Sequence, residues 1–239
     1  MSRNRHPSKK QPGISILKRI KRLFVYGFVI AFLVSIALVA LLRFVPAHTS
    51  AFMLQDHVED LVSGRGYRAI DQRWVSRSKI SKYAFAAVIA SEDQRFYRHH
   101  GIDFEAVYKA YKQHMNGGKL RGASTISQQV AKNLFLTSSK SFARKALEVW
   151  FTLLIEGLWS KHRILEMYLN IAEFGDHLYG IEAASRHYFH IPAKRLSARQ
   201  AALLAATLPN PAILRAERPS PYLLRRQNWI LGQMRNLNY

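Results

Sequence analysis

The stretch AFAAVIASEDQRFYRHHG, Ala84 to Gly101, joins an apolar helical run to an abrupt polar ending at Glu92 and Asp93. A carboxylate at the C-terminal end of a buried helix is disfavoured in its charged form by desolvation and by the negative end of the helix dipole. Such a group is suited to taking up a proton near neutral pH. Glu92 is therefore a candidate base, although an acidic helix end before a solvated loop is the commoner meaning of such a pair.

The residues from Leu23 to Leu42 carry no charge over twenty positions. At helical rise, this length crosses a hydrocarbon core of about 30 Å. A core helix of a soluble protein normally has a polar face, and this run has none. We predict a transmembrane helix over residues 23–42. The run exceeds the usual signal-peptide core of about 7–15 residues, which favours an uncleaved anchor over a cleaved signal peptide.

The charges that flank this run predict its orientation. Residues 1–22 contain eight basic residues and no acidic one, whereas residues 43–62 contain one basic residue, Arg43. Because positive charges stay on the cytoplasmic side, we expect a cytoplasmic tail over residues 1–22 and everything after the span outside the cytoplasm. Residues 43–60 are expected to form a connector with a short amphipathic piece at Phe52 to Leu54, and residues 61–239 a single domain.

The remainder of the chain is also basic. Without the tail, 28 basic residues face 15 acidic ones, a net charge of +13. Outside the cytoplasm, such a surface meets few nucleic acids, so anionic lipid headgroups or a phosphate-bearing substrate are the expected partners. A generic solubilising surface is the alternative meaning of this charge. The chain has no cysteine, so it contains no disulfide.

Helical periodicity dominates after the span, and no window shows sustained strand-like alternation. The expected class is mostly α. Glycine pairs and a proline cluster punctuate the pattern. It predicts helices over Ile80–Arg95, Phe104–Met115, Thr125–Leu136, Ser141–Ser160, Lys161–Leu169, Tyr179–Phe189, Ser197–Thr207 and Tyr222–Leu237.

The segment RGASTISQQVAKN, Arg121 to Asn133, is typical of a glycine-containing loop that runs into a helix. We predict Ser124 as the N-cap, which leaves free backbone N–H groups and the positive dipole end at the helix start. Ser124, Gln128 and Lys132 then share one face and suit a phosphate or pyrophosphate. A capped amphipathic helix with an ordinary polar face is the simpler alternative.

The segment Ser141 to Trp159 is apolar nearly all round, which predicts a buried helix. Glu148 and Glu156 inside it would be costly unless they are paired or functional. A structural pair between Arg144 and Glu148 is the competing explanation.

Histidines alone do not predict a metal centre here. The chain contains His99-His100 and His187-x-x-His190, but it lacks the H-E-x-x-H spacing of zinc enzymes. We therefore expect no metal site.

Taken together, these segments resemble the peptidoglycan glycosyltransferases, glycosyltransferase family 51, a domain that also forms the N-terminal half of class A penicillin-binding proteins. The resemblance covers about Ser50 to the C-terminus. With no penicillin-binding module after Tyr239, the chain resembles the monofunctional members. Five ordered blocks carry it: EDQRFYRHHG (92–101), GASTISQQVAKN (122–133), RKALE (144–148), KHRILEMYLNIAEFG (161–175) and ALLAATLPNP (202–211).

The resemblance implies a lysozyme-like, mostly α fold with a small lobe that contacts the membrane. Ser50–Leu54 and Phe104–Leu120 are the segments expected to form that lobe. The resemblance also implies roles for individual residues. Glu92 would be the general base, and Glu148 a second carboxylate near the donor pyrophosphate or the developing sugar cation. Pyrophosphate and substrate contacts would come from Ser124, Gln128, Gln129, Lys132, Arg144 and Lys145, and support from Asp93, Phe96, His99 and Asn133.

The implied reaction joins lipid II to a growing glycan strand in a β-1,4 linkage, with inversion and release of undecaprenyl pyrophosphate. It requires no cofactor, although a divalent cation, Mg²⁺ or Mn²⁺, is compatible with it because such a cation screens a pyrophosphate. The implied location is the bacterial inner membrane, with one span and a periplasmic catalytic domain. Penicillin-binding and division proteins are compatible partners, but no residue names them.

Two other functions fit parts of the pattern. A lysozyme-like enzyme that cleaves peptidoglycan also uses two carboxylates on an α-rich domain. A non-catalytic, membrane-tethered module that binds anionic polymer would use the basic surface alone. Lys132 and Arg144 favour glycosyl transfer over hydrolysis, because a hydrolase has no pyrophosphate to hold. The chain departs from some relatives at two positions, where it has Lys140 and Leu147.

Overall fold

The computed structural model describes residues 16–118, 122–139 and 141–237. The chain forms two compact units, Met1–Leu38 and Val39–Tyr239. Some residues used in the sequence analysis lie outside the described part: Arg3, Arg5, Lys9, Lys10, residues 119–121 and Lys140.

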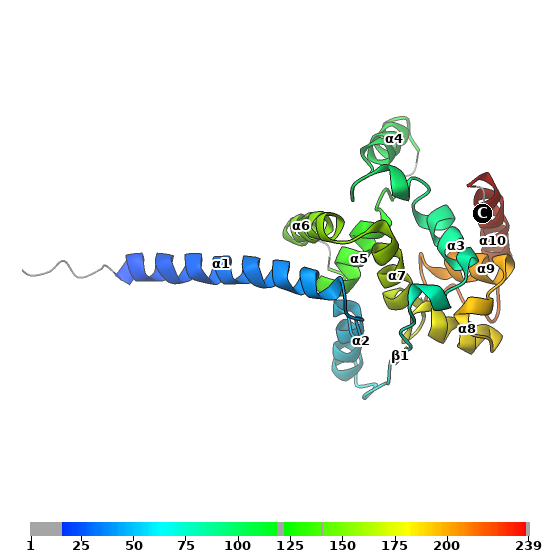
Figure 1. The fold of residues 1–239 in the computed structure, drawn as a ribbon, viewed down its shortest axis with the longest axis horizontal. Helices are drawn as coiled ribbons and strands as arrows, with labels where there is room; N and C mark the ends of the chain where they lie inside the picture. Colours follow the sequence, from blue (N-terminus) through cyan, green and yellow to red (C-terminus); the bar gives the residue numbers. More distant parts are fainter. Residues whose placement is uncertain (1–15, 119–121, 140, 238–239) are drawn as a thin grey trace, which may run out of the picture. The chain divides into compact units, whose positions relative to one another are not determined.

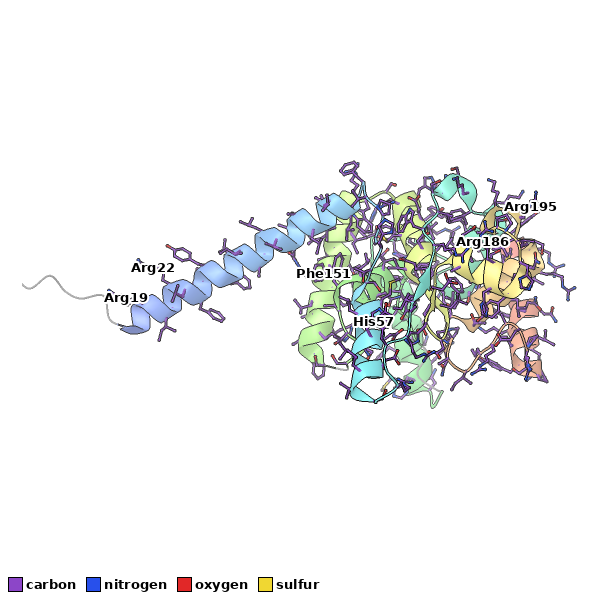
Figure 2. The ribbon with its side chains drawn as sticks, turned by 90° about the horizontal axis from the view of Figure 1, so that it is seen from below. Arg19, Arg22, His57, Phe151, Arg186 and Arg195 are labelled. Atoms are coloured by element: carbon purple, nitrogen blue, oxygen red, sulfur yellow. The ribbon has the colours of Figure 1, made fainter. Side chains whose placement is uncertain are left out.

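The first unit consists of most of helix α1 (Ile16–Leu42). Residues Lys18–Leu42 of this helix are long and apolar enough to cross a membrane. Most of its side chains are exposed, unlike those of a core helix in a soluble protein. Arg19 and Arg22 lie near its start (Figure 2), before the predicted span over residues 23–42.

The second unit is mostly helical, as predicted (Figure 1). Its helices are α2 (Ala51–Val62), α3 (Lys82–Glu92), α4 (Phe104–Met115), α5 (Ile126–Phe135), α6 (Phe142–Leu158), α7 (Lys161–Ile171), α8 (Ile181–Phe189), α9 (Ala198–Thr207) and α10 (Pro221–Asn236).

Short polar residues fix where most of these helices begin. An N-cap side chain accepts a hydrogen bond from a backbone N–H of the first turn, which would otherwise have no partner. Eight helices of the second unit begin in this way, after Ser50, Ser81, Asp103, Thr125, Ser141, Ser160, Ser197 and Ser220.

Two groups of helices carry the core. Helix α9 packs against α3 and α10, and α5 packs against α6 and α7, while α3 also contacts α7 (Figure 1). The buried face of α9 is rich in alanine, including Ala201, Ala202, Ala205 and Ala206. Such small side chains let neighbouring helices approach closely. The end of α3, where Glu92 lies, is therefore held by packing on several sides.

The connector predicted over residues 43–60 contains more structure than expected. Helix α2 runs for 12 residues from Ala51 and continues past residue 60, whereas the sequence indicated an amphipathic piece at Phe52 to Leu54. Within the second unit, Asp56 and Asp60 of α2 make hydrogen bonds with Tyr179 and His177, respectively. A helix that packs through polar side chains shows only a weak hydrophobic periodicity in its sequence, so its full length was not predicted.

A small sheet was missed by the sequence analysis. Strands β1 (Asp71–Gln72), β2 (Glu173–Gly175) and β3 (Leu178–Tyr179) pair in the order β1-β3-β2. Strand β3 is parallel to β1 and antiparallel to β2. Strands of two or three residues are too short to show an alternating pattern.

The prediction that the helix from Ser141 is buried was wrong. Phe142 is 97% exposed, and Leu147 and Leu153 are about half exposed, because one side of α6 packs on α5 and the other faces outward. Phe151 stacks on Phe135 of α5 with ring centroids 4.4 Å apart. An apolar pattern does not distinguish a protein interior from another apolar surrounding.

The helix predicted over Ile80–Arg95 is also shorter than expected. Helix α3 begins at Lys82 and ends at Glu92, because the backbone of Asp93 leaves the helical conformation. The other predicted helices of the second unit differ from the observed ones by up to two residues at their ends.

Candidate active site

Glu92 is the last residue of α3, and hydrogen-bond donors from three segments reach its carboxylate. Ser91 Oγ donates to Oε1 at 2.7 Å, and Gln129 Nε2 of α5 donates to Oε2 at 3.1 Å. Arg226 Nη2 of α10 lies 3.4 Å from Oε1 and 3.0 Å from Ser91 Oγ. The Glu92 side chain is 14% exposed. The carboxylate is thus fixed in position and still accessible.

That exposed part faces a cleft of about 380 Å³. The cleft is lined by Ser91 to Arg95, at and just after the end of α3, by Asp103 and Ala106 at the start of α4, and by the loop Gly122–Thr125. Ser124 therefore lines the same cleft as Glu92.

Asp93 joins the end of α3 to the start of α5. Its carboxylate accepts a hydrogen bond from the backbone N–H of Ile126 at 3.1 Å and lies 3.0 Å from His99 Nε2. Thr125 Oγ1 donates to the carbonyl oxygen of Gly101 at 2.5 Å. Asp93 and His99 are buried, so they position the two helix ends that border the cleft.

The prediction that Ser124 caps the next helix was wrong. Thr125 is the N-cap, and its hydroxyl accepts from the backbone N–H of Gln128 while Gln128 Oε1 accepts from the backbone N–H of Thr125. This reciprocal arrangement is the capping box, whose S/T-x-x-E/Q pattern is present at Thr125 and Gln128 but not at Ser124.

The two neighbouring glutamines consequently have different tasks. Gln128 is buried, and its side-chain oxygen is used by the cap. Gln129 points to Glu92 and is the glutamine that contacts the candidate base.

Phe96 and Asn133 are the other residues that were expected to support the site. Phe96 is fully buried, and Lys161 Nζ lies 4.4 Å from its ring centroid. Lys161 Nζ also lies 2.8 Å from Glu156 Oε1, so the charge of Glu156 inside α6 is neutralised. Asn133 is half-buried on α5.

The pair between Arg144 and Glu148, which was the competing explanation for this carboxylate, is present. Glu148 is 3% exposed, Arg144 Nη1 lies 2.7 Å from its Oε2, and Lys145 Nζ binds its Oε1. The two cations compensate the cost of burying this carboxylate. Glu148 is not among the residues that line the cleft beside Glu92.

Lys132 on α5 lies within electrostatic reach of both glutamates. Burial lowers the pKa of its ammonium group, and the Glu148 carboxylate raises it. The Glu92 carboxylate raises this pKa to a smaller extent. Lys132 Nζ lies 5.1 Å from the ring centroid of Phe52 in α2. The charges of Arg144 and Lys145 lower the pKa of Lys132 as well, so three cations act together here, as suits a polyanionic ligand.

Sequence reasoning missed several residues of this site. Ser91, Phe52 and Arg226 contact Glu92 or Lys132, but they lie outside the five blocks and none was assigned a role in the site. Tyr168 lies inside the fourth block and donates to Gln129, but nothing in the sequence connects the two.

Within the described residues, no group of three or more histidine, aspartate or glutamate side chains is arranged to hold a metal ion.

Known proteins are similar in sequence to this chain over most of its length. The family model for transglycosylases matches residues 59–235. A biosynthetic peptidoglycan transglycosylase of Pasteurella multocida (strain Pm70) is 47% identical over 98% of this chain and 94% of the relative. Proteins of the same name from Chromohalobacter salexigens and Haemophilus influenzae are 54% and 53% identical, over 85% and 84% of this chain and 86% and 82% of their own lengths.

Proposed function

Because this chain belongs to the transglycosylase family, we propose that it extends glycan strands from lipid II, with Glu92 as the general base. Peptidoglycan glycosyl transfer in cell-wall synthesis is its function, as the names of its relatives indicate. The observation that carries the residue assignment is the position of Glu92. Its carboxylate is held by donors from α3, α5 and α10 and borders a cleft of about 380 Å³.

In the proposed reaction, a Glu92 oxygen takes the proton of the acceptor's 4-hydroxyl group. The oxygen of that hydroxyl forms a bond to C1 of the donor sugar, and the bond between C1 and the pyrophosphate oxygen breaks. The linkage inverts from α to β, and undecaprenyl pyrophosphate leaves with the bonding electron pair. A base of this kind contributes about 10²–10⁴-fold to the rate.

Cations on α5 and α6 would stabilise the leaving pyrophosphate. Lys132 is partly buried, and Arg144 and Lys145 are held on the carboxylate of Glu148. Preorganised positive charge stabilises the negative charge that develops on a leaving group. In this proposal, Glu148 holds its two cations in place rather than transferring a proton. Ser124, which lines the cleft, would donate a hydrogen bond to the substrate.

The chain is associated with a membrane through the apolar helix near its N-terminus. We place residues 1–22 in the cytoplasm, residues 23–42 in the bacterial inner membrane, the connector at 43–60 and the catalytic domain at 61–239 in the periplasm. The basic residues before the span support this orientation. Lipid II, the growing glycan strand and membrane lipid are the proposed partners, joined by penicillin-binding and division proteins that would use the product.

The test is polymerisation of purified lipid II by the full-length protein in detergent micelles or vesicles. Glu92→Gln should lower the rate by at least about 10²-fold and leave the melting temperature unchanged. Glu217→Gln removes the same charge at an exposed position and should leave the rate unchanged. Polymerisation by Glu92→Gln at the wild-type rate would refute the assignment of the base. Release of soluble fragments from isolated sacculi, without polymerisation, would favour a peptidoglycan-cleaving enzyme instead.

A further inference from the structure

Tyr168 of α7 is connected to the candidate base, Glu92, through one intervening side chain. Its side chain is 1% exposed, and its hydroxyl donates to Gln129 Oε1 at 3.0 Å. On the other end of the same amide, Gln129 Nε2 donates to Glu92 Oε2 at 3.1 Å. Three side chains from three helices therefore form one directed chain of hydrogen bonds.

The direction of this chain follows from the chemistry of its members. Burial raises the pKa of the Tyr168 hydroxyl well above its ordinary value, and the charge of Glu92 raises it further. Tyr168 therefore keeps its proton and acts as a donor. A hydroxyl that donates to the amide oxygen of Gln129 leaves the amide nitrogen on the opposite side, where Glu92 accepts from it.

Because Tyr168 is buried, the presence of its hydroxyl group requires an explanation beyond the packing of its ring. A phenylalanine ring would fill nearly the same volume, so packing alone does not account for the hydroxyl. Burying a hydroxyl without a partner is costly, and the partner used here is the oxygen of Gln129 rather than a backbone carbonyl.

We propose that Tyr168 is a positioning residue for glycosyl transfer, which holds the Gln129 amide so that its nitrogen fixes Glu92 Oε2 and turns the carboxylate toward the cleft. This inference rests on the proposed function, because it assigns a task in the step for which Glu92 is the base. The sequence block that contains Tyr168 would then contribute to the base from outside the cleft.

Two charged groups near Glu92 also affect how the rate of polymerisation depends on pH. Arg226 of α10 lies 3.4 Å from its Oε1, and Lys132 of α5 acts on it at longer range. Variants at Tyr168 and Gln129 leave both cations in place. A change in the acid limb of the profile can therefore be attributed to the hydrogen-bond chain.

The test compares Tyr168→Phe with the wild type in full-length protein, using steady-state polymerisation of lipid II between pH 5 and pH 9. We expect kcat to fall on the order of tenfold, with KM within twofold of the wild type. The acid limb should move to higher pH, because a Gln129 amide that Tyr168 no longer holds donates less well to the charged carboxylate.

A double-mutant cycle separates positioning from general damage to the fold. Gln129→Leu removes the middle of the chain and should change kcat and the acid limb in the same direction. Added to Gln129→Leu, Tyr168→Phe should have no further effect on kcat. Tyr179→Phe is a matched control, because Tyr179 is equally buried and its hydroxyl donates at 2.7 Å to Asp56, which is not a cleft residue. It should leave kcat and the pH profile unchanged.

The outcomes are distinct. An active wild type with an unaffected Tyr168→Phe variant, or equal losses in both backgrounds of the cycle, would overturn the inference and leave the proposed function intact. Wild-type kcat in Gln129→Leu would do the same, even if Tyr168→Phe failed to fold. A wild type that does not polymerise lipid II would overturn the proposed function and this inference with it.

Discussion

Glu173 at the start of β2 should make the stability of the fold depend on pH. Burial raises the pKa of its carboxyl group to about 7, and the charges of Asp56, Asp176 and Glu59 raise it too, while His177 opposes them. In the unfolded chain, the same group titrates near 4.5. Between these two values, the folded protein holds a proton that the unfolded chain has released.

The sign follows from this difference in bound protons. The contribution of Glu173 to stability is fully present below about pH 4.5 and is lost as the pH rises through about 7. At about 1.4 kcal/mol for each tenfold change in proton affinity, its ceiling is about 3 kcal/mol. Because Glu173 is only partly buried, solvent screening reduces this to about 1–2 kcal/mol.

Glu173→Gln keeps the shape of the side chain and removes its titration. Relative to the wild type, the melting temperature should rise by about 2–8 °C at pH 8 and stay unchanged at pH 4.5, as expected for a domain of about 200 residues. The measurement is thermal unfolding of the full-length protein in detergent across this pH range. Glu217→Gln, at an exposed position, controls for the loss of one negative charge. An increase in melting temperature of the same size at both pH values would refute the reasoning.

Two further substitutions test the site and the fold. Arg226→Ala removes the cation beside Ser91 and Glu92, so the acid limb of the polymerisation profile should move to higher pH and the rate at pH 7 should fall several-fold. Arg225→Ala is the exposed control, and an equal loss in both variants would contradict a specific contact. Gly180→Ala should lower the unfolding free energy by at least about 1–2 kcal/mol in denaturant titrations, because φ is +85° and the new Cβ would lie 2.8 Å from a backbone oxygen. Gly157→Ala, whose Cβ would meet open space, should not destabilise the protein, and a similar loss there would argue against the strain.

The helical part of the fold could be predicted because its signals are local. An apolar run followed by a polar residue or glycine marked most helices, and short polar residues such as Ser141 and Ser197 marked their starts. The sheet could not be predicted in this way. Asp71 pairs with Leu178, more than one hundred residues later, and a strand of two residues leaves no periodic pattern.

Predicting which helices are buried requires knowledge of what lies around each one. Helix α6 was expected in the core because its sequence is apolar nearly all round, yet Phe142 and Leu153 are exposed. The same composition would suit an interface with lipid, with another protein or with the core. The charged pair of Arg144 and Glu148, by contrast, was predictable, because a spacing of four residues brings side chains together on any helix.

The sequence predicted the site within single segments of the chain, but not the contacts between those segments. Glu92 and Gln129 could be named as candidates from their own segments, but their contact depends on how α3 meets α5. Asp93 fixes this contact, because it lies at the C-terminal end of α3 and its carboxylate accepts a hydrogen bond from a backbone N–H in the first turn of α5. Asp93, which the sequence analysis gave only a supporting role, therefore determines where the second block lies relative to the first.

Arg226 illustrates why the remainder could not be predicted. It reaches Glu92 from α10, across 134 positions of sequence, and packing of α10 on α3 and α9 is what brings it there. With Gln129 on one carboxylate oxygen and Ser91 and Arg226 on the other, the base is restrained from both sides before any substrate arrives. Restraint of this kind reduces the reorganisation that the reaction must supply, and it requires rigid packing of helices that are distant in sequence. In the proposed mechanism the helical core is therefore part of the catalytic apparatus, and substitutions that loosen α10 should lower turnover even where no substrate contact is lost.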